Sequence, residues 1–442
     1  MPGQFIFASI NYGKKNYLIH IKNYCGCFVD LKEYRKMSHI VNTWSSIDNT
    51  DPSLNSQCCG CEACANICGH KAIEMRYDEE GFYYPIVDEN KCTNCGLCQK
   101  ICPVSNECES KEPYKTTFAG YSSDGKTLEA CATGGFATEL SRLIIQQGGM
   151  VFGVAFTEDF VKSEYRAATT LAELDSFSGS KYVQSRKNDV YKQVKAHLNA
   201  QELVLFVGCP CDVAALKLFL HREYENLLTV ELVCMGVTSY KIAEYYKNWA
   251  EKKYQSRLIY LNPRSKEKGW FVPQLDVRFE SGKKLLFPLY GSYYGYGSQV
   301  FNRPSCYQCQ YRGRTGVADI RIGDFWGIKQ TDPFWNTKGV SVIYVRSDKG
   351  LMFLNQLKQK EFCFFEVDYD TATLSNMSSF MNKPHKYVVL REKFTKEFLY
   401  GKGLPAACWR TASLGFVVKN VVPIRWQGCL KTIFHLFVDH KR

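Results

Sequence analysis

Two matched cysteine ladders constrain this chain more than any other feature of its sequence. Both follow the spacing C-x2-C-x2-C-x3-C, and their members are Cys58, Cys61, Cys64 and Cys68, then Cys92, Cys95, Cys98 and Cys102. This spacing is typical of thiolates that hold cubane [4Fe–4S] clusters. Structural zinc and disulfides are the rival interpretations, but zinc sites favour two separated cysteine pairs. The ladders therefore predict a ferredoxin-like module with two clusters.

The fourth cysteine of each ladder is expected to serve the other cluster. In two-cluster ferredoxins the remote thiolate closes the neighbouring cluster. We therefore expect Cys102 to join the first three cysteines of the first ladder, and Cys68 to join the first three of the second. Gly69 follows the first ladder where Pro103 follows the second, a change that removes no ligand.

Length and cysteine content limit the class of protein. A chain of 442 residues is expected to contain more than one domain. It has 21 cysteines, an odd and clustered set that favours metal ligands in a reducing cytoplasm over a secreted disulfide scaffold. No signal peptide is evident, and no apolar run reaches the roughly 18 residues of a membrane span.

The net charge of +12 does not by itself indicate a binding partner. Much of it lies near the C-terminus, but no nucleic-acid-binding motif accompanies it, so we expect a solvated basic face and no nucleic-acid partner. Apolar residues at helical spacing follow Pro423. They are Trp426, Leu430, Ile433, Phe434 and Phe437. Docking on the protein itself is the default for this stripe, and membrane contact is at most peripheral.

The sequence predicts an α+β or α/β fold, in which the two-cluster module precedes an α/β flavin-binding domain. The expected domains are an unassigned extension (1–50), the ferredoxin-like module (51–112), an FAD and iron–sulfur oxidoreductase domain (113–370) and a basic C-terminal region (371–442). The third divides into parts at about 114–197 and 198–370.

Local patterns predict several elements. Alternation predicts strands at 73–77 and 82–87 around a turn at 78–81. After Gly134-Gly135, apolar spacing predicts a helix from Phe136, and strands are expected at 150–156, 203–207 and 227–234. Asp212 is a plausible N-cap for a helix that reaches residue 220. A mobile aromatic loop is expected from four tyrosines in a Gly-rich stretch. They are Tyr290, Tyr293, Tyr294 and Tyr296.

A second group of cysteines falls at turns of the α/β region. Its members are Cys209, Cys211, Cys234, Cys306 and Cys309. From the residues alone, a third cluster and a zinc site are about equally favoured, and buried free thiols are a third option. Spacing does not decide among these.

Longer motifs around these cysteines resemble the coenzyme F420 hydrogenase/dehydrogenase beta-subunit family. The motifs lie at 208–212 (GCPCD), 231–237 (ELVCMGV), 303–309 (RPSCYQC) and 323–327 (GDFWG). Segments at 133–135 (TGG) and 179–185 (GSKYVQS) resemble flavin-side segments of that family. The resemblance covers roughly residues 55–360.

The resemblance implies an FAD-binding iron–sulfur flavoprotein. By position, a flavin-proximal third cluster would be held by Cys211, Cys234, Cys306 and Cys309. Cys209 stands where the family often has threonine, and is thus a spare thiol or a competing ligand. The implied flavin contacts are Gly134, Gly135, Ser180, Lys181, Tyr182 and Gln184. Paired glycines let backbone N–H groups approach a phosphate at a helix N-terminus.

The function expected from these features is a flavin-dependent oxidoreductase. It would move electrons between a reduced carrier, F420-like or a ferredoxin, and a small-molecule substrate that the sequence does not identify. The alternative is an electron-transfer subunit without its own substrate that feeds a partner oxidoreductase. The sequence does not separate these two functions, and no catalytic residue is assigned.

Overall fold

The computed structural model describes residues 8–12, 15–19, 57–106, 108, 114–313, 316–358, 362–374, 376 and 381–413. The chain divides into two units, Met1–Val41 and Asn42–Arg442. In the first unit the structure describes an antiparallel hairpin of β1 (Ala8–Tyr12) and β2 (Lys15–Ile19). The apolar stripe predicted at 426–437 lies outside the described residues.

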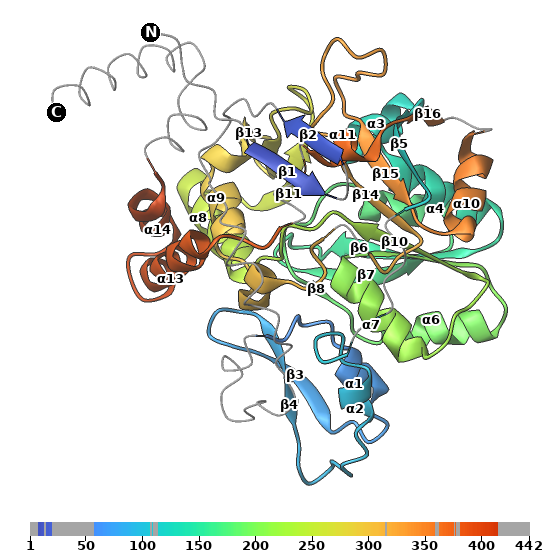
Figure 1. The fold of residues 1–442 in the computed structure, drawn as a ribbon. Helices are drawn as coiled ribbons and strands as arrows, with labels where there is room; N and C mark the ends of the chain where they lie inside the picture. Colours follow the sequence, from blue (N-terminus) through green and yellow to red (C-terminus); the bar gives the residue numbers. More distant parts are fainter. Residues whose placement is uncertain are drawn as a thin grey trace. The chain divides into compact units, whose positions relative to one another are not determined.

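A mixed sheet forms the centre of the second unit (Figure 1). Its order across the described strands is β16-β5-β15-β14-β10-β9-β6-β7-β8. Their bounds, in that order, are Phe362–Glu366, Thr116–Ser122, Ser341–Val345, Ile320–Asp324, Leu227–Leu232, Val204–Gly208, Met150–Phe156, Ser163–Ala168 and Ser185–Arg186. Strands β6, β9, β10 and β14 run parallel. Pairs from β14 to β16 through β15 and β5 are antiparallel.

Helices cover both faces of this sheet. On β6, Val151 packs into the apolar cluster that contains α4 (Phe136–Gln146) and α10 (Asp348–Lys358). The next residue, Phe152, packs into the cluster of α6 (Val190–Asn199) and α7 (Pro210–Leu220). Successive side chains of a strand point to opposite faces, so this alternation places the two helix pairs on opposite sides of the sheet.

A smaller antiparallel sheet forms a second core with four helices. Its strands are β11 (Leu258–Ser265), β12 (Gln274–Phe279) and β13 (Lys284–Pro288). The helices are α8 (Tyr240–Tyr254), α9 (Tyr293–Val300), α13 (His385–Leu399) and α14 (Leu404–Thr411). Tyr294 and Tyr296 belong to α9 and are buried in this core. The predicted mobile aromatic loop is therefore wrong, because these rings have apolar neighbours to pack against.

Short helices connect the larger elements. They are α3 (Gly125–Ala130), α5 (Leu171–Leu174), α11 (Tyr369–Leu374) and the 3-10 turns at Asp175–Phe177, Leu289–Gly291 and Pro304–Gln308. No helix within the described ranges is both long enough and apolar enough to cross a membrane.

The cysteine-rich module contains α1 (Ala63–Ile67), β3 (Ile73–Tyr77), β4 (Tyr83–Val87) and α2 (Leu97–Lys100). The predicted hairpin is confirmed, with Ile73 opposite Val87. Cys61 and Ala63 belong to the apolar cluster of α6 and α7, and the Tyr191 hydroxyl donates to the Cys61 carbonyl at 3.0 Å. The module therefore shares a core with the α/β region.

The predicted fold class is confirmed, and so are the helix from Phe136 and the strand at 150–156. Asp212 is not an N-cap: α7 begins at Pro210 after Cys209, and Asp212 lies in its first turn. Its carboxylate pairs with Lys187 and Tyr165 instead. Strand β10 ends at Leu232, earlier than predicted, which leaves Cys234 in the following loop.

Candidate electron-transfer site

The structure brings Cys102 to three thiols of the first ladder. Burial raises the pKa of Cys64, and the charges of Cys58 and Cys102 raise it further. Cys61 is likewise under the influence of Cys102 and Cys64. These four side chains are the set that the crossed pairing predicts for one cluster, although their role as ligands stays a prediction. Four thiolates are the donor set of a [4Fe–4S] cluster.

The backbone around the first ladder turns through left-handed conformations. Gly60 has φ +66° and Glu62 has φ 62°, and α1 starts directly after them. The Gly60 amide donates to the Cys58 sulfur at 3.4 Å. A Cβ atom on Gly60 would lie 2.1 Å from the Gln184 amide nitrogen. Only glycine fits here, because the α/β region approaches the cysteine loop closely.

The second ladder is more open. Cys95 is exposed, and burial followed by the charges of Cys92 and Cys95 raises the pKa of Cys98. The charge of Cys98 also contributes to the raised pKa of Cys64 in the first ladder, so the two ladders adjoin. The Cys68 sulfur accepts a hydrogen bond from the Ala72 amide at 3.3 Å. Its expected place in the second cluster stays a prediction.

Four cysteines of the α/β region also gather. Cys306 and Cys309 interact through their charges with Cys234. A side-chain hydrogen bond from Cys209 lowers the pKa of Cys234 to about 7. The Gly236 amide donates to the Cys234 sulfur at 3.4 Å. Cys209, the N-cap of α7, is therefore the thiol that adjoins this group most directly.

Cys211 faces the cysteine-rich module. Its thiol interacts with the Cys59 thiol and raises its own pKa by doing so, and Cys59 interacts in the same way with Cys61. Cys59 lies inside the first ladder but outside its spacing, and it was not predicted as a site residue. The adjacent cysteine pair, Cys58-Cys59, was the available signal. As the side chains stand in the described part of the chain, no group of three or more His, Cys, Asp or Glu is arranged to hold a metal ion.

A buried ion pair lies beside Cys211 in the first turn of α7. Lys187 Nζ lies 2.9 Å from Asp212 Oδ1, and both side chains are almost fully buried. The Tyr165 hydroxyl donates to Asp212 Oδ2 at 3.0 Å. Burial acts to lower the pKa of Lys187, but the Asp212 carboxylate raises it on balance. This pair fixes the first turn of α7, which carries Cys211.

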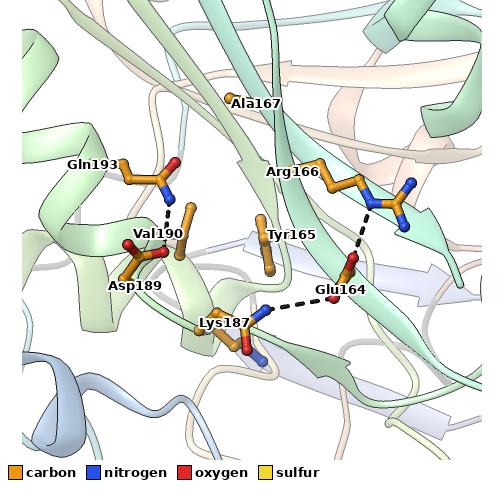
Figure 2. Close-up of a pocket in the computed structure, with 9 residues that line it drawn as sticks. Glu164, Tyr165, Arg166, Ala167, Lys187, Asp189, Val190 and Gln193 are labelled. Carbon is orange, nitrogen blue, oxygen red and sulfur yellow. Dashed lines mark hydrogen bonds and ion pairs between the residues drawn. The ribbon is translucent and has the colours of Figure 1, made fainter.

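A polar cavity of about 240 Å³ opens beside this pair, between β7 and the start of α6 (Figure 2). Glu164 accepts hydrogen bonds from Arg166 and Asn188, and Asp189 accepts one from Gln193. None of the six residues predicted to contact flavin lines it. Its charged side chains already have partners, Arg166 with Glu164 and Lys187 with Asp212, and this polar lining makes it a poor receptor for an apolar ring.

The glycines predicted to contact flavin are packed by protein. The Gly134 amide donates to Ser341 Oγ at 3.0 Å, and a Cβ there would lie 2.3 Å from the Gly120 carbonyl oxygen. Gly135, at φ +87°, is the N-cap of α4. Glu139 lies in the first turn and accepts a hydrogen bond from Ser122. The close packing of Gly134 explains its lack of a side chain without a ligand.

Basic side chains surround the same turn, and two of them were not predicted. Lys266 Nζ donates to the Thr133 carbonyl at 2.8 Å, and Arg264 donates to the Ala132 carbonyl and to Asp324. Both are buried. Their signal in the sequence is weak, because lone Arg and Lys side chains usually face solvent.

The 178–182 segment adjoins that turn. A Cβ on Gly179 would lie 3.9 Å from the Ala130 carbonyl oxygen. Lys181 Nζ donates to the carbonyls of Ser178 and Gly179, and burial lowers the pKa of Lys181 to about 7. Tyr182 interacts through side-chain hydrogen bonds with Ser180 and Arg264.

Gln184 lies elsewhere. Its side chain contacts Arg303 and the carbonyls of Cys59 and Gly60. The structure thus brings five of the six predicted flavin residues to one region and places Gln184 at the cysteine-rich module. Their contacts with a flavin stay predictions.

Comparison with known proteins supports the iron–sulfur assignment. Residues 57–106 match the family described as 4Fe-4S dicluster domain. Residues 201–368 match the family described as the C terminus of the coenzyme F420 hydrogenase/dehydrogenase beta subunit. The predicted resemblance is confirmed over these two segments. The comparison with curated proteins found no match.

Among solved structures, one similar chain comes from a study of xenon derivatization of the F420-reducing [NiFe] hydrogenase complex from Methanosarcina barkeri. Identity is 20% and the TM-score is 0.45, and the match covers 66% of this chain and 95% of that chain. A TM-score this low has no bearing on function.

Proposed function

We propose that this chain is an iron–sulfur flavoprotein oxidoreductase. It joins a 4Fe-4S dicluster domain to a domain that matches the C terminus of the coenzyme F420 hydrogenase/dehydrogenase beta subunit. It passes electrons between a reduced carrier, F420-like or a ferredoxin, and a small-molecule substrate. Its 21 cysteines suit a reducing cytoplasm.

One observation carries this proposal: electrostatic interactions between thiols link the groups of cysteines within the Asn42–Arg442 unit. Cys98 adjoins Cys64 of the first ladder. Cys61 contacts Cys59, and Cys59 contacts Cys211. Cys211 in turn interacts electrostatically with Cys209. Cys209 interacts with Cys234. Clusters held by these groups would follow one another along the unit, as a path for single electrons requires.

The third group has one more thiol than a cluster needs. Cys234, Cys306 and Cys309 would supply three ligands, and the resemblance assigns the fourth to Cys211. The contact between Cys209 and Cys234 favours Cys209. We keep both as alternatives for the fourth ligand, and the iron content of single variants distinguishes them.

Support for the flavin comes from charge. Arg264 and Lys266 donate to carbonyls of the turn at 131–135, and Lys181 lies in the 178–182 segment that adjoins it. A cluster of basic side chains beside a helix N-terminus suits a diphosphate. Lys266 has an uncharged oxygen and a thiol as its hydrogen-bond partners in the described structure. A bound flavin would supply the conversion of a two-electron hydride transfer into single-electron steps.

The alternative function is an electron relay without its own substrate. The same thiol series favours it, since a relay needs the clusters and not the flavin. Anaerobic purification followed by iron, sulfide and flavin analysis separates the two functions. The oxidoreductase should contain about twelve iron atoms per chain, four for each of three clusters, and one flavin. Protein that binds neither FAD nor FMN after supply of both would refute the flavoprotein and leave the relay.

The flavin residues need a variant that leaves the fold intact. Substitution at Gly135 is unsuitable, because its φ of +87° strains any other residue. Lys181→Met removes the charge at a partly buried position, and Lys126→Met removes an exposed charge on α3 as a control. Lys181→Met should weaken flavin binding at least tenfold with iron content unchanged, and Lys126→Met should change neither.

A further inference from the structure

Arg303 lies buried between the cysteine-rich module and the α/β region. Its side chain is inaccessible to solvent. Nε donates to the Cys58 carbonyl at 2.6 Å, Nη2 to the Tyr83 carbonyl at 2.7 Å and Nη1 to Gln184 Oε1 at 3.1 Å. The guanidinium also lies 4.0 Å from the centroid of the Tyr84 ring. Through these hydrogen bonds Arg303 links the module to the segment that precedes Cys306.

These partners supply hydrogen bonds but no full negative charge. A guanidinium keeps its proton in proteins, and a buried charge without a counter-charge is costly. Asp78 acts on Arg303 through its charge, and its carboxylate accepts a hydrogen bond from the Phe82 amide at 2.8 Å. Within the described residues, the hydrogen-bond partners of the Arg303 guanidinium are two backbone carbonyls and a side-chain amide.

Other buried arginines of this chain are paired differently. Arg264 has Asp324 at 2.7 Å, and Arg321 and Arg346 share Glu231 at 2.5 and 2.8 Å. Each of these guanidinium groups has its opposite charge in contact. Arg303 is thus an exception among the buried arginines compared, because the hydrogen-bond partners of its guanidinium are all neutral.

Thiols are the groups in the right place. Arg303 Nε donates to the Cys58 carbonyl at 2.6 Å, and the Arg303 carbonyl accepts a hydrogen bond from the Cys306 amide at 3.0 Å. After Tyr84, the ionisable side chains that act on the guanidinium are Cys58 and Cys59 in the module and Cys306 in the α/β region. The first and third belong to two different groups of cysteines. A cluster with its four thiolates is an anion, so loaded sites on both sides would supply the missing negative charge.

We propose that Arg303 is the shared counter-charge of the two cluster sites that contain Cys58 and Cys306, and that it raises the reduction potentials of both. This proposal rests on the proposed function, because it requires clusters at those sites. Reduction adds negative charge to a cluster, and a fixed positive charge in a poorly solvated position stabilises the reduced state more than the oxidised state. Arg303 is a positioning residue that acts through charge.

Two substitutions remove this charge by different routes. Arg303→Met removes it outright. Gln184→Glu is nearly isosteric and places a carboxylate against Nη1 as a counter-charge for the guanidinium. It also removes the amide that donates to the Cys59 and Gly60 carbonyls, a loss that Gln184→Met shares. We expect both to shift the potential of at least one cluster to more negative values. The ratio of reduced to oxidised cluster at a fixed potential should fall at least tenfold, which is about 59 mV for a one-electron couple.

Two further substitutions keep the charge and change the contacts. Arg303→Lys retains a cation at the same place, and Gln184→Met removes the hydrogen-bond acceptor of Nη1. In both, the ratio of reduced to oxidised cluster should stay within about threefold of wild type, because the electrostatic contribution is retained. If Arg303→Met does not fold, Gln184→Glu still tests the proposal, because it leaves every buried volume almost unchanged.

The measurement is a potentiometric titration of the anaerobic full-length protein, followed by electron paramagnetic resonance, with iron counted in each sample. Potentials unchanged in Arg303→Met or Gln184→Glu at full iron content would overturn the proposal. So would equal shifts in Gln184→Met and Gln184→Glu, since they would assign the effect to packing. Wild-type protein without iron would instead refute the proposed function, and the counter-charge with it.

Discussion

The buried Lys187–Asp212 pair should stabilise the first turn of α7 strongly. Lys187→Met removes the cation 2.9 Å from the carboxylate and leaves Asp212 buried, with the Tyr165 hydroxyl as a remaining donor. Removal of one partner of a buried ion pair costs about 3–5 kcal/mol. Because Cys209 and Cys211 lie at this turn, the loss should reach the thiols as well as the fold.

The cost of proton uptake by the orphaned carboxylate sets an upper bound on the stability that Lys187→Met can remove. An orphaned carboxylate can lose its charge by binding a proton, which at pH 7 costs about 4 kcal/mol for an ordinary aspartate pKa of about 3.9 at about 1.36 kcal/mol per unit. We therefore expect Lys187→Met to lower the free energy of unfolding by about 3–4 kcal/mol at pH 7. The proton becomes easier to bind as the pH falls, so the difference from wild type should shrink towards pH 5.

Urea unfolding of the anaerobic protein, followed by intrinsic fluorescence at pH 7 and pH 5, measures this difference. Lys192→Met, an exposed lysine on α6, is the matched control and should change the free energy by less than about 0.5 kcal/mol. A loss below about 1 kcal/mol in Lys187→Met, or a loss that grows towards pH 5, would refute the reasoning.

Three other predictions concern the cysteines, the flavin region and the module contact. If Cys209 is the fourth ligand of the third site, Cys209→Ser should lower the iron content from about twelve to about eight atoms per chain, and Cys211→Ser should retain about twelve; the reverse result would assign Cys211. Because burial lowers the pKa of Lys181 to about 7, its positive charge is lost as the pH rises through 7. FAD affinity, measured by fluorescence quenching, should therefore be higher at pH 6 than at pH 8, and this difference should vanish in Lys181→Met. Gly60→Ala would place a Cβ 2.1 Å from the Gln184 side chain at φ +66°, so it should lower the melting temperature and increase proteolysis of the 57–106 module; unchanged proteolysis would contradict the close approach.

Much of the fold could be predicted from local pattern. Strand alternation at 73–77, the apolar spacing after Gly135 and the buried run at 150–156 each depend on neighbours in sequence, and the structure confirms them. Boundaries set by tertiary contacts were less predictable. Asp212 is a residue type that favours N-caps, but the buried Lys187 ammonium and the Tyr165 hydroxyl outcompete the backbone for its carboxylate. That contact has no local signature.

The candidate site, like the fold, was only partly predictable from the sequence. The ladder spacing by itself determined that eight thiols lie in one small module, because such short separations bring successive cysteines to one side of a tight loop. Spacing carries no information about which thiol of a different segment adjoins another. Only tertiary packing placed Cys59 against Cys211, Cys209 against Cys234 and a fully buried Arg303 between the two groups. Such contacts join residues of different elements, and they are decided by how whole elements pack.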